Sequence, residues 1–378
     1  MITDYISGMS ATTIFWAVNS IAVFCVCVLC TGLFIPQILR ISFRKRLFDK
    51  PEERKIHQGI VPRLGGIAFN PVIFFAMALV FGLCQSLGYQ NMLGEIATES
   101  RTLAFTFCCV TMLYFVGIAD DLVGIRYKAK FAVQIACGIM MVAGGMWVSN
   151  LHGLLGIYEL SEWLKYPLTI LVVVFIINSI NFIDGIDGLA SGLCGMASLF
   201  YGIVFLLVHE YAYAVLSFAT LGVLVPFFYY NVFGDATKHR KIFMGDTGSL
   251  TIGLILCVLS LKLLQYPETG IPEDFPNVFV LAYSPLFIPC LDVVRVYLHR
   301  VRNGKNPFLP DKNHIHHKLL ATGLHQRMAM VAIVTASVLF SLFNILLSVY
   351  IDVTLLVIID VMTWTLMNVW LRKRIKKE

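Results

Sequence analysis

Two aspartates stand where a long apolar run ends, and each is followed by a glycine. The run YPLTILVVVFIINSI leads into NFIDGIDGLASG, which holds Asp184 and Asp187 three residues apart and Asn181 one helical turn before Asp184. Glycines let a backbone approach a ligand closely, and carboxylate oxygens suit a hard cation. Glycine-flanked aspartates also form plain turns. The pattern therefore leaves a ligand site and a simple turn open.

Three further aspartates lie at the ends of apolar runs. Asp120 and Asp121 are adjacent, and adjacent helical side chains point about 100° apart, so at most one faces a shared site while the other supports it or a loop. Asp246 lies between glycines in FMGDTGSL at the expected start of a helix, where unpaired N–H groups suit phosphate and the carboxylate suits Mg²⁺. The plainer alternatives are a solvated pair and an ordinary N-cap by Asp246 or Thr247.

The segment PFLPDKNHIHHK places three histidines close to basic residues. His314, His316 and His317 follow Arg302 and Lys305 along the chain. Zinc is not favoured, because neither a cysteine nor an HExxH pair accompanies the histidines. Imidazoles among cations suit a diphosphate or a sugar, although a solvated basic loop would give the same pattern.

Other polar residues flank the same apolar runs. Lys130 shares a helical face with Gln134, which suits an anionic ligand, and Asn231 follows a later run. Asp292 has Arg295 one turn later, so it either joins the site or simply forms an ion pair.

The elements that must position these residues are predicted to be membrane-spanning helices. The 378-residue chain is 58% hydrophobic and 14% charged, with a mean hydropathy of +0.78 that lies outside the range of soluble domains. A spanning helix needs about 20 apolar residues, and the alternating pattern of barrel strands is absent. Asp360, inside the last span without a polar neighbour, is predicted to have no role. We expect an all-α polytopic integral membrane protein with one domain over residues 1–378 and about eleven spans, of which the fifth and eighth extend into their flanks: Phe15–Leu39, Gly66–Leu87, Leu103–Ala119, Phe131–Val148, Tyr166–Ile180, Leu189–Val208, Tyr211–Tyr230, Ser249–Leu264, Val278–Tyr297, Met328–Ile351 and Thr354–Leu371.

The basic residues predict the orientation of these spans. Lys and Arg are retained on the cytoplasmic side, and an outside N-terminus with a cytoplasmic C-terminus puts all but Arg101, Lys165 and Lys262 of the 29 basic residues there. The net charge of +6 then marks an inner face suited to anionic lipid or phosphate, with no sign of nucleic-acid binding. All the clusters above fall on this side, so the predicted active site is formed by the loops 40–65, 120–130, 181–188, 231–248 and 298–327.

Acidic oxygens, basic groups and a position at the inner boundary together suggest phosphoryl chemistry between a soluble and a lipid substrate. The alternative is a membrane transporter or flippase for a lipid-linked sugar or an organic anion. Carriers usually place charges near the bilayer midplane, whereas the charges here crowd one boundary.

These blocks resemble the signatures of the polyprenyl-phosphate N-acetylhexosamine-1-phosphate transferases, the glycosyltransferase 4 type. The matching stretches are FVGIADDLVGIRYKAKFAVQ, NSINFIDGIDGLASG, YYNVFGDATKHRKIFMGDTGSL and NPFLPDKNHIHHKLL, in the family's order. DKPEERKIHQGIVPRLGG is similar to the first cytoplasmic loop of the bacterial WecA/TagO-like undecaprenyl-phosphate N-acetylglucosamine-1-phosphate transferases. The resemblance runs from about Asp49 to Leu320, and the last two spans match only in hydropathy.

The resemblance implies an enzyme of the bacterial cytoplasmic (inner) membrane that faces the cytoplasm. It would move a sugar 1-phosphate from a UDP-N-acetylhexosamine to undecaprenyl phosphate, release UMP and require Mg²⁺ or Mn²⁺. Such a step starts the synthesis of a cell-envelope glycan, such as a cell-wall polymer or the lipopolysaccharide O-antigen. The form His-Ile-His-His is similar to the N-acetylglucosamine-using branch, because the muramoyl-pentapeptide branch usually has three consecutive histidines. A homodimer is a further expectation, and the sugar and the downstream glycan stay open.

Carried over by position, the resemblance also implies residue roles. We expect Asp120 to orient the acceptor or act as a base, in a direct attack on the donor; a covalent intermediate on a carboxylate stays open. The expected catalytic residues are Asp120, Asp121, Asp184 and Asp187, the metal ligands are Asp246 and Asp121, and the substrate-binding residues are Lys130, Asn181, Asn231, Asp292, Arg302, His314, His316 and His317.

Overall fold

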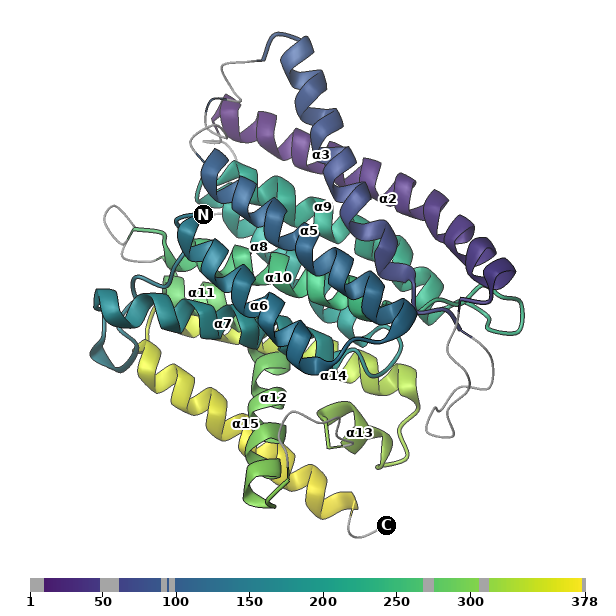
Figure 1. The fold of residues 1–378 in the computed structure, drawn as a ribbon. Coiled ribbons are helices and arrows are strands. Elements are labelled where there is room, and N and C mark those ends of the chain that lie inside the picture. The colour runs from purple at the N-terminus through teal and green to yellow at the C-terminus, as the bar shows by residue number, and fades with distance from the viewer. Residues whose placement is uncertain are drawn as a thin grey trace. The chain divides into compact units, whose positions relative to one another are not determined.

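The fold is all-α, as the composition predicts. The computed structural model describes residues 10–47, 61–89, 94, 99–267, 275–305 and 313–375, and in these ranges the one extended pairing is an isolated bridge between Asn150 and Glu159. The chain is a polytopic membrane protein (Figure 1). Ten helical stretches of the described residues are long and apolar enough to cross a membrane: α2 Ala11–Lys45, the turn and helix α3 Gly65–Ser86, α5 Ser100–Val123, α7 Glu162–Ile183, α8 Leu189–Leu207, α9 Tyr211–Val232, α10 Gly245–Leu264, α11 and α12 together Val278–Arg302, α14 Gln326–Leu347 and α15 Val353–Ile375.

The predicted span Phe131–Val148, which is not among these ten, is helical but short. Helix α6, Tyr127–Ala143, has 17 residues and so measures about 26 Å, less than the roughly 30 Å of hydrocarbon. Its predicted end at Val148 is wrong, because Gly144 and Gly145 stop the helix and Gly145 adopts a φ of 94°. Helices α7 and α10 do extend beyond their predicted spans, as expected.

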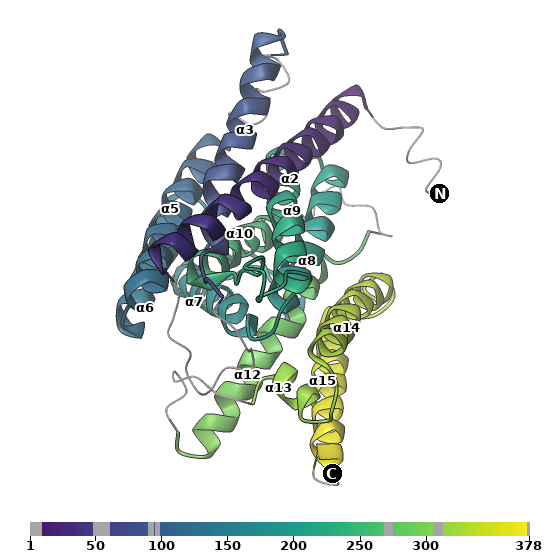
Figure 2. The same cartoon turned by 90° about the vertical axis from the view of Figure 1, so that its right-hand side faces the viewer.

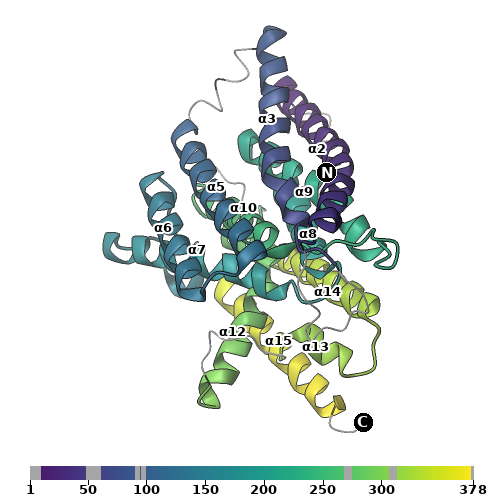
Figure 3. The same cartoon turned by 45° about the vertical axis from the view of Figure 1, so that its right-hand side comes forward.

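The chain forms two compact units. Unit 1 comprises Met1–Arg126 and Cys194–Thr251, and its helices α2, α3 and α9 pack together (Figure 3). A Cβ on Gly222 of α9 would lie 2.7 Å from the carbonyl oxygen of Phe24, so α2 and α9 approach each other closely. Closer to the start of α2, Trp16 stacks on Tyr211 with 5.8 Å between the ring centroids. These contacts hold α2 firmly along α9.

Unit 2 comprises Tyr127–Leu193 and Ile252–Glu378. Helix α6 packs on α7, and a Cβ on Gly138 would lie 3.0 Å from the Cα of Ile170. Helix α12, Phe287–Arg302, follows the short helix α11 and contacts α7. The one-turn helix α13, Ile315–Leu320, contacts both α14 and α15 (Figure 2). This unit therefore surrounds the histidine segment with several helix ends.

The expectation that Asp360 lacks a polar neighbour is wrong. Asp360 is buried on α15, and its Oδ2 accepts hydrogen bonds of 2.7 Å from the Tyr283 hydroxyl and from Nδ2 of Asn344. Both partners come from other helices of unit 2, so the sequence around Asp360 gives no sign of them. The carboxyl is satisfied as a buried polar group must be.

Candidate active site

In unit 1, Asp121 at the end of α5 caps the start of α10. Its Oδ1 accepts from the amide of Asp246 at 2.8 Å, and its Oδ2 accepts from the amide and hydroxyl of Thr247 at 2.9 and 2.6 Å. These partners lie 125 and 126 residues after Asp121 in the chain. A carboxylate offers about four acceptor positions, so these three bonds leave about one for any other ligand. Asp121 thereby fixes the helix start that carries Asp246.

The prediction of free amides at this helix start is wrong for the second and third residues of α10. The amides of Asp246 and Thr247 are taken by Asp121, because a helix N-terminus attracts a carboxylate as readily as a phosphate. The cap also comes from neither Asp246 nor Thr247 itself. The side chain of Asp246 remains half-buried beside the cap.

Glycines make this close approach possible. Gly245 has a φ of 74°, and a Cβ there would lie 2.0 Å from the carbonyl oxygen of Arg63 and 2.6 Å from Asp121. A Cβ on Gly117 of α5 would lie 2.4 Å from the Cα of Thr247, and one on Gly66 would lie 2.1 Å from the amide nitrogen of Gly248. Three stretches of chain therefore meet at the start of α10 with no room for a side chain.

Asp120 and Asn231 lie in the same unit and bind backbone groups. Asp120 Oδ1 accepts from the amide of Ile125 at 2.6 Å, so the adjacent aspartates serve different segments, as their 100° separation predicts. Asn231 is buried, and its amide donates to the carbonyl of Ile242 at 2.8 Å. This bond ties the segment before α10 to the end of α9.

In unit 2, Asp292 anchors the histidine segment. It is fully buried on α12, and it accepts from Arg295 at 2.7 Å, from Nδ1 of His314 at 2.8 Å and from the amide of Ile315 at 3.1 Å. Arg295 also donates to the carbonyl of Asn313. Asp292 therefore forms the ion pair with Arg295 and also holds the histidine segment in place.

His316 is the buried and unpartnered member of this segment. It is 1% exposed, and neither Nδ1 nor Nε2 has a hydrogen-bond partner. Its ring is parallel to that of His314 at 5.8 Å and lies 4.2 Å from that of His317. Burial, followed by the charges of His317 and His314, lowers the pKa of His316 to about 3, so the ring is neutral at pH 7. Buried polar atoms without partners call for an explanation, and a bound water or ligand is one of them.

The turn with the two Asp-Gly pairs meets His316. A Cβ on Gly185 would lie 2.2 Å from Nε2 of His316, so only glycine fits there. Asp184 is the exposed cap residue after α7, and Asp187 is half-buried in the same turn. Asn181 lies in the last turn of α7. The structure therefore brings the turn and the histidine segment of unit 2 together.

Gln134 on α6 binds a neighbouring helix. Gln134 is buried, and its Oε1 accepts from Asn178 of α7 at 2.7 Å, which makes it a tie between α6 and α7. Lys130 is half-buried one turn earlier on α6. The expectation that both suit one anionic ligand stays a prediction.

A pocket of about 430 Å³ borders the histidine segment in unit 2. It has both cationic and apolar walls, and Arg302 lies on its rim. Lys318 donates to Oδ1 of Asn368 at 2.9 Å, and burial followed by the charge of Arg295 lowers the pKa of Lys318 to about 8. Sequence reasoning missed Lys318 and the α15 wall, because that span matches only in hydropathy. The lining residues are Leu291, Val294, Arg295, Leu298, His299, Arg302, Asn313, Lys318, Val361, Trp364, Thr365, Asn368, Val369 and Arg372.

Some features of the resemblance lie outside the described residues. These are most of the loop from Asp49 and the PFLPDK stretch with Lys312. Among the residues that are described, no three His, Cys, Asp or Glu side chains gather as a metal-binding group. Mg²⁺ commonly uses one or two carboxylates together with substrate phosphates, so Asp246 beside Asp121 still fits such an ion.

Comparisons with known proteins agree with the motifs. Residues 103–264 match glycosyl transferase family 4. The chain is 30% identical over 318 residues to the undecaprenyl-phosphate alpha-N-acetylglucosaminyl 1-phosphate transferase of Escherichia coli K12, which covers 84% of this chain and 80% of the relative. It is 33% identical over 332 residues to the probable undecaprenyl-phosphate N-acetylglucosaminyl 1-phosphate transferase of Bacillus subtilis. This alignment covers 87% of this chain and 85% of the relative. The undecaprenyl-phosphate alpha-N-acetylglucosaminyl 1-phosphate transferase of Salmonella typhi is 31% identical over 313 residues. This alignment covers 82% of this chain and 79% of the relative.

Proposed function

Since the chain belongs to glycosyl transferase family 4, we propose that it transfers N-acetylglucosamine 1-phosphate from UDP-N-acetylglucosamine to undecaprenyl phosphate and releases UMP. The names of the relatives support this reaction. The structural observation that carries it is the capped start of α10, where Asp121 fixes the segment that presents Asp246.

We propose Mg²⁺ as the cofactor, held by Asp246 with the remaining acceptor position of Asp121. The ion would neutralise the diphosphate of the donor, which is its chemical contribution when bound. Asp246 suits this role because it is half-buried, lies at the positive end of a helix and has a fixed backbone. Mn²⁺ has the same preference for oxygen ligands and is a natural substitute.

The acceptor needs orientation more than activation. The second pKa of a phosphate monoester is near 6, so undecaprenyl phosphate is mostly a dianion at pH 7. Its oxygen attacks the β-phosphorus of the donor, the bond from that phosphorus to the bridging oxygen breaks, and UMP leaves with the electron pair. Asp120 orients the acceptor phosphate in this scheme. A carboxylate nucleophile is the competing scheme, and it predicts UMP release before the acceptor binds.

The histidine segment is proposed to hold the sugar phosphate of the donor. Neutral His316 offers one N–H donor and one acceptor nitrogen, which suits a sugar hydroxyl or N-acetyl group better than a bare charge. His314 and His317 flank it, and Asp184 and Asp187 belong to the turn that contacts it. Lys130, Asn181 and Asn231 stay predictions as further substrate contacts.

The pocket beside α12 is proposed to receive the lipid phosphate. Arg295, Arg302 and Lys318 supply positive charge, and Leu291, Val294 and Trp364 supply an apolar wall. An anionic headgroup on a polyprenyl chain requires both surfaces at one site.

We further propose that the N-terminus lies outside, that the C-terminus and the active site face the cytoplasm, and that the protein resides in the bacterial inner membrane. The basic residues support this orientation. The product would be the first lipid-linked intermediate of an envelope glycan, and a homodimer remains part of the proposal.

The first test is UMP release by purified protein with undecaprenyl phosphate, Mg²⁺ and each of several UDP-N-acetylhexosamines. We expect UMP only when lipid phosphate is present, and fastest with UDP-N-acetylglucosamine. One equivalent of UMP per protein in the absence of acceptor would favour the covalent scheme. No release from folded protein, combined with movement of a lipid-linked sugar across a vesicle, would replace the transferase with the flippase.

A further inference from the structure

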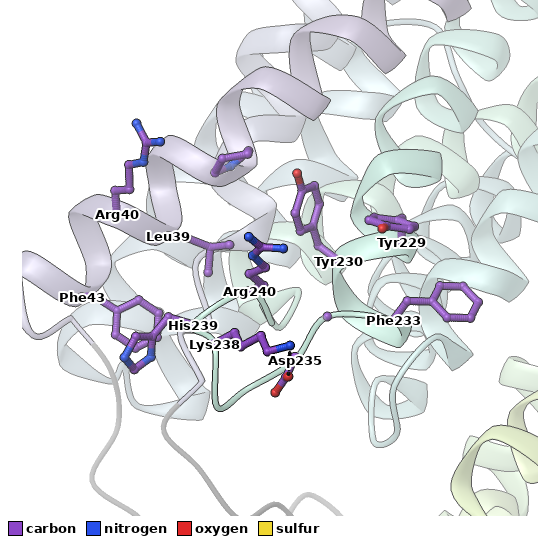
Figure 4. Close-up of a pocket in the computed structure, with 12 residues that line it drawn as sticks. Leu39, Arg40, Phe43, Tyr229, Tyr230, Phe233, Asp235, Lys238, His239 and Arg240 are labelled. Atoms are coloured by element: carbon purple, nitrogen blue, oxygen red, sulfur yellow. Dashed lines mark ion pairs between the residues drawn. The ribbon is translucent and has the colours of Figure 1, made fainter.

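A second pocket lies in unit 1, at the end of α2 and α9, outside all the site residues discussed above. It measures about 690 Å³ and is formed by α2, α9 and the segment 233–240 (Figure 4). One wall is apolar and aromatic, with Leu39 and Phe43 from α2 and with Tyr229, Tyr230 and Phe233 from α9 and the residue after it. The pocket thus opens beside two long membrane helices.

The pocket also has basic lining residues, one from α2 and the others from the segment 233–240 (Figure 4). Arg40, Lys238 and Arg240 line the pocket together with His239, and Asp235 is the one acid among the described lining residues. Asp235 is engaged within its own turn, where Oδ1 accepts from the amide and hydroxyl of Thr237 at 2.9 and 2.6 Å. Lys238 pairs with Asp235, with 3.8 Å between Nζ and Oδ2, so the net positive charge of the lining comes from Arg40 and Arg240, and the pocket favours an anion.

The pocket is preformed. The rings of Phe43 and His239 lie 4.1 Å apart, and the amide of Arg240 donates to the carbonyl of Asp235 at 3.0 Å. A Cβ on Gly234 would lie 2.1 Å from the carbonyl oxygen of Tyr230, so the segment packs directly on the end of α9. A binding site of this kind does not have to be ordered by its ligand.

The lining selects an anion that carries lipid chains. Tyr229 and Phe233 are 61% and 57% exposed at the end of an apolar helix, as aromatic residues at a membrane interface are. On α2, Leu33 lies one turn before the lining residue Pro36 and is 71% exposed. Together they form apolar surface that continues from the pocket along the helix, which an acyl chain can cover. A soluble phosphate would contact the cations but would leave this apolar surface uncovered.

We propose that this pocket binds the headgroup of an anionic phospholipid, with its phosphate against Arg40, Lys238 and Arg240 and its acyl chains along α2. The lipid is a structural ligand that joins the ends of α2 and α9, and it is distinct from the acceptor lipid. The proposal does not depend on the reaction that the protein catalyses.

The experiment uses the purified full-length chain, stripped of lipid in detergent and titrated with phosphatidylglycerol or phosphatidylcholine. Binding is measured by native mass spectrometry and by the rise in melting temperature. The test variant is Arg40→Gln with Arg240→Gln, and the matched control is Arg44→Gln with Lys45→Gln, which removes the same charge from the same end of α2 outside the pocket. We expect the test variant to lose about 30-fold in affinity for phosphatidylglycerol, from two phosphate contacts.

Several results would overturn the proposal. These are equal binding of phosphatidylcholine, an equal loss in the control, or the same stabilisation by inorganic phosphate or UDP, which would indicate a soluble anion. If the double variant fails to fold, Lys238→Gln replaces it, because that side chain is 72% exposed. It should lose about fivefold in affinity, and an unchanged affinity would exclude Lys238 from the site.

Discussion

The polar residues around Asp121 in unit 1 and those around Asp292 and His316 in unit 2 differ in whether their polar atoms are satisfied. In unit 1, Asp121 uses both oxygens to cap α10, and the backbones around it leave no space. In unit 2, the carboxylate of Asp292 likewise accepts several hydrogen bonds. His316 in the adjacent segment is buried, and neither of its ring nitrogens has a hydrogen-bond partner among the described residues. The backbone of the first group is fixed by its own hydrogen bonds, and its remaining carboxylate oxygens are left for the proposed metal, whereas the buried ring of His316 in the second group has no hydrogen-bond partner among the described residues. Substitutions should therefore separate positioning from binding.

The largest effect is expected for Asp246→Asn. The change removes the charge that would hold the metal at nearly constant shape, so kcat should fall at least about 1000-fold while the melting temperature stays within about 2 °C of the wild type. UMP release and a thermal unfolding scan measure the two quantities. Retention of more than a tenth of the activity at saturating Mg²⁺ would remove Asp246 from the metal site.

Asp121→Asn should damage both stability and activity. The amide group of asparagine would face backbone N–H donors, so the cap would lose a charged hydrogen bond and gain an unpaired donor, at a cost of about 3 kcal/mol of unfolding free energy. We expect about a 100-fold loss of kcat through displacement of Asp246. The control for stability is Asp120→Asn, whose carboxyl accepts from a loop amide instead of capping a helix. Equal melting temperatures for the two variants would contradict the cap.

His316→Phe tests whether the unpartnered ring of His316 binds the donor. The phenyl ring is larger and crowds Gly185, but it removes two unpartnered nitrogens, so the two effects should offset each other and stability should change little. The KM for the UDP-sugar should rise about 100-fold, because donor contacts are lost. Titration of the acceptor serves as the control. A variant with unchanged donor KM but a large loss of stability would make His316 a structural residue.

The same histidine predicts a pH dependence of stability. Its pKa is lowered to about 3 in the folded protein, whereas an unfolded histidine titrates near 6.5, so the unfolded chain binds the extra proton between these values. The stability contributed by neutral His316 is present above pH 6.5 and is lost progressively as the pH falls toward 3. The difference in melting temperature between wild type and His316→Phe should grow over this range. A constant difference would show that the ring is not held neutral.

How far the sequence predicts this arrangement depends on the range of the interaction. The helices and the motif positions follow from local hydropathy, and the stop of α6 follows from Gly144 and Gly145, although that signal was missed. The Asp121 cap could not be predicted, because it depends on which helix start meets which helix end across 125 residues. The partners of Asp360 and of Gln134 likewise come from other helices. Glycines at 66, 117 and 245 were the available hint, because crowded backbones require them.

The smallest effect concerns Lys318, which extends the comparison to the pocket beside the histidines. Burial and Arg295 lower its pKa to about 8, so it is charged at pH 7 and loses its charge as the pH rises through 8. If it contacts the lipid phosphate, kcat/KM for undecaprenyl phosphate should fall about tenfold between pH 7 and pH 9. Lys318→Arg should remove this step, because arginine stays charged throughout. The same fall in the arginine variant would assign the titration to another group and leave Lys318 as a partner of Asn368 alone.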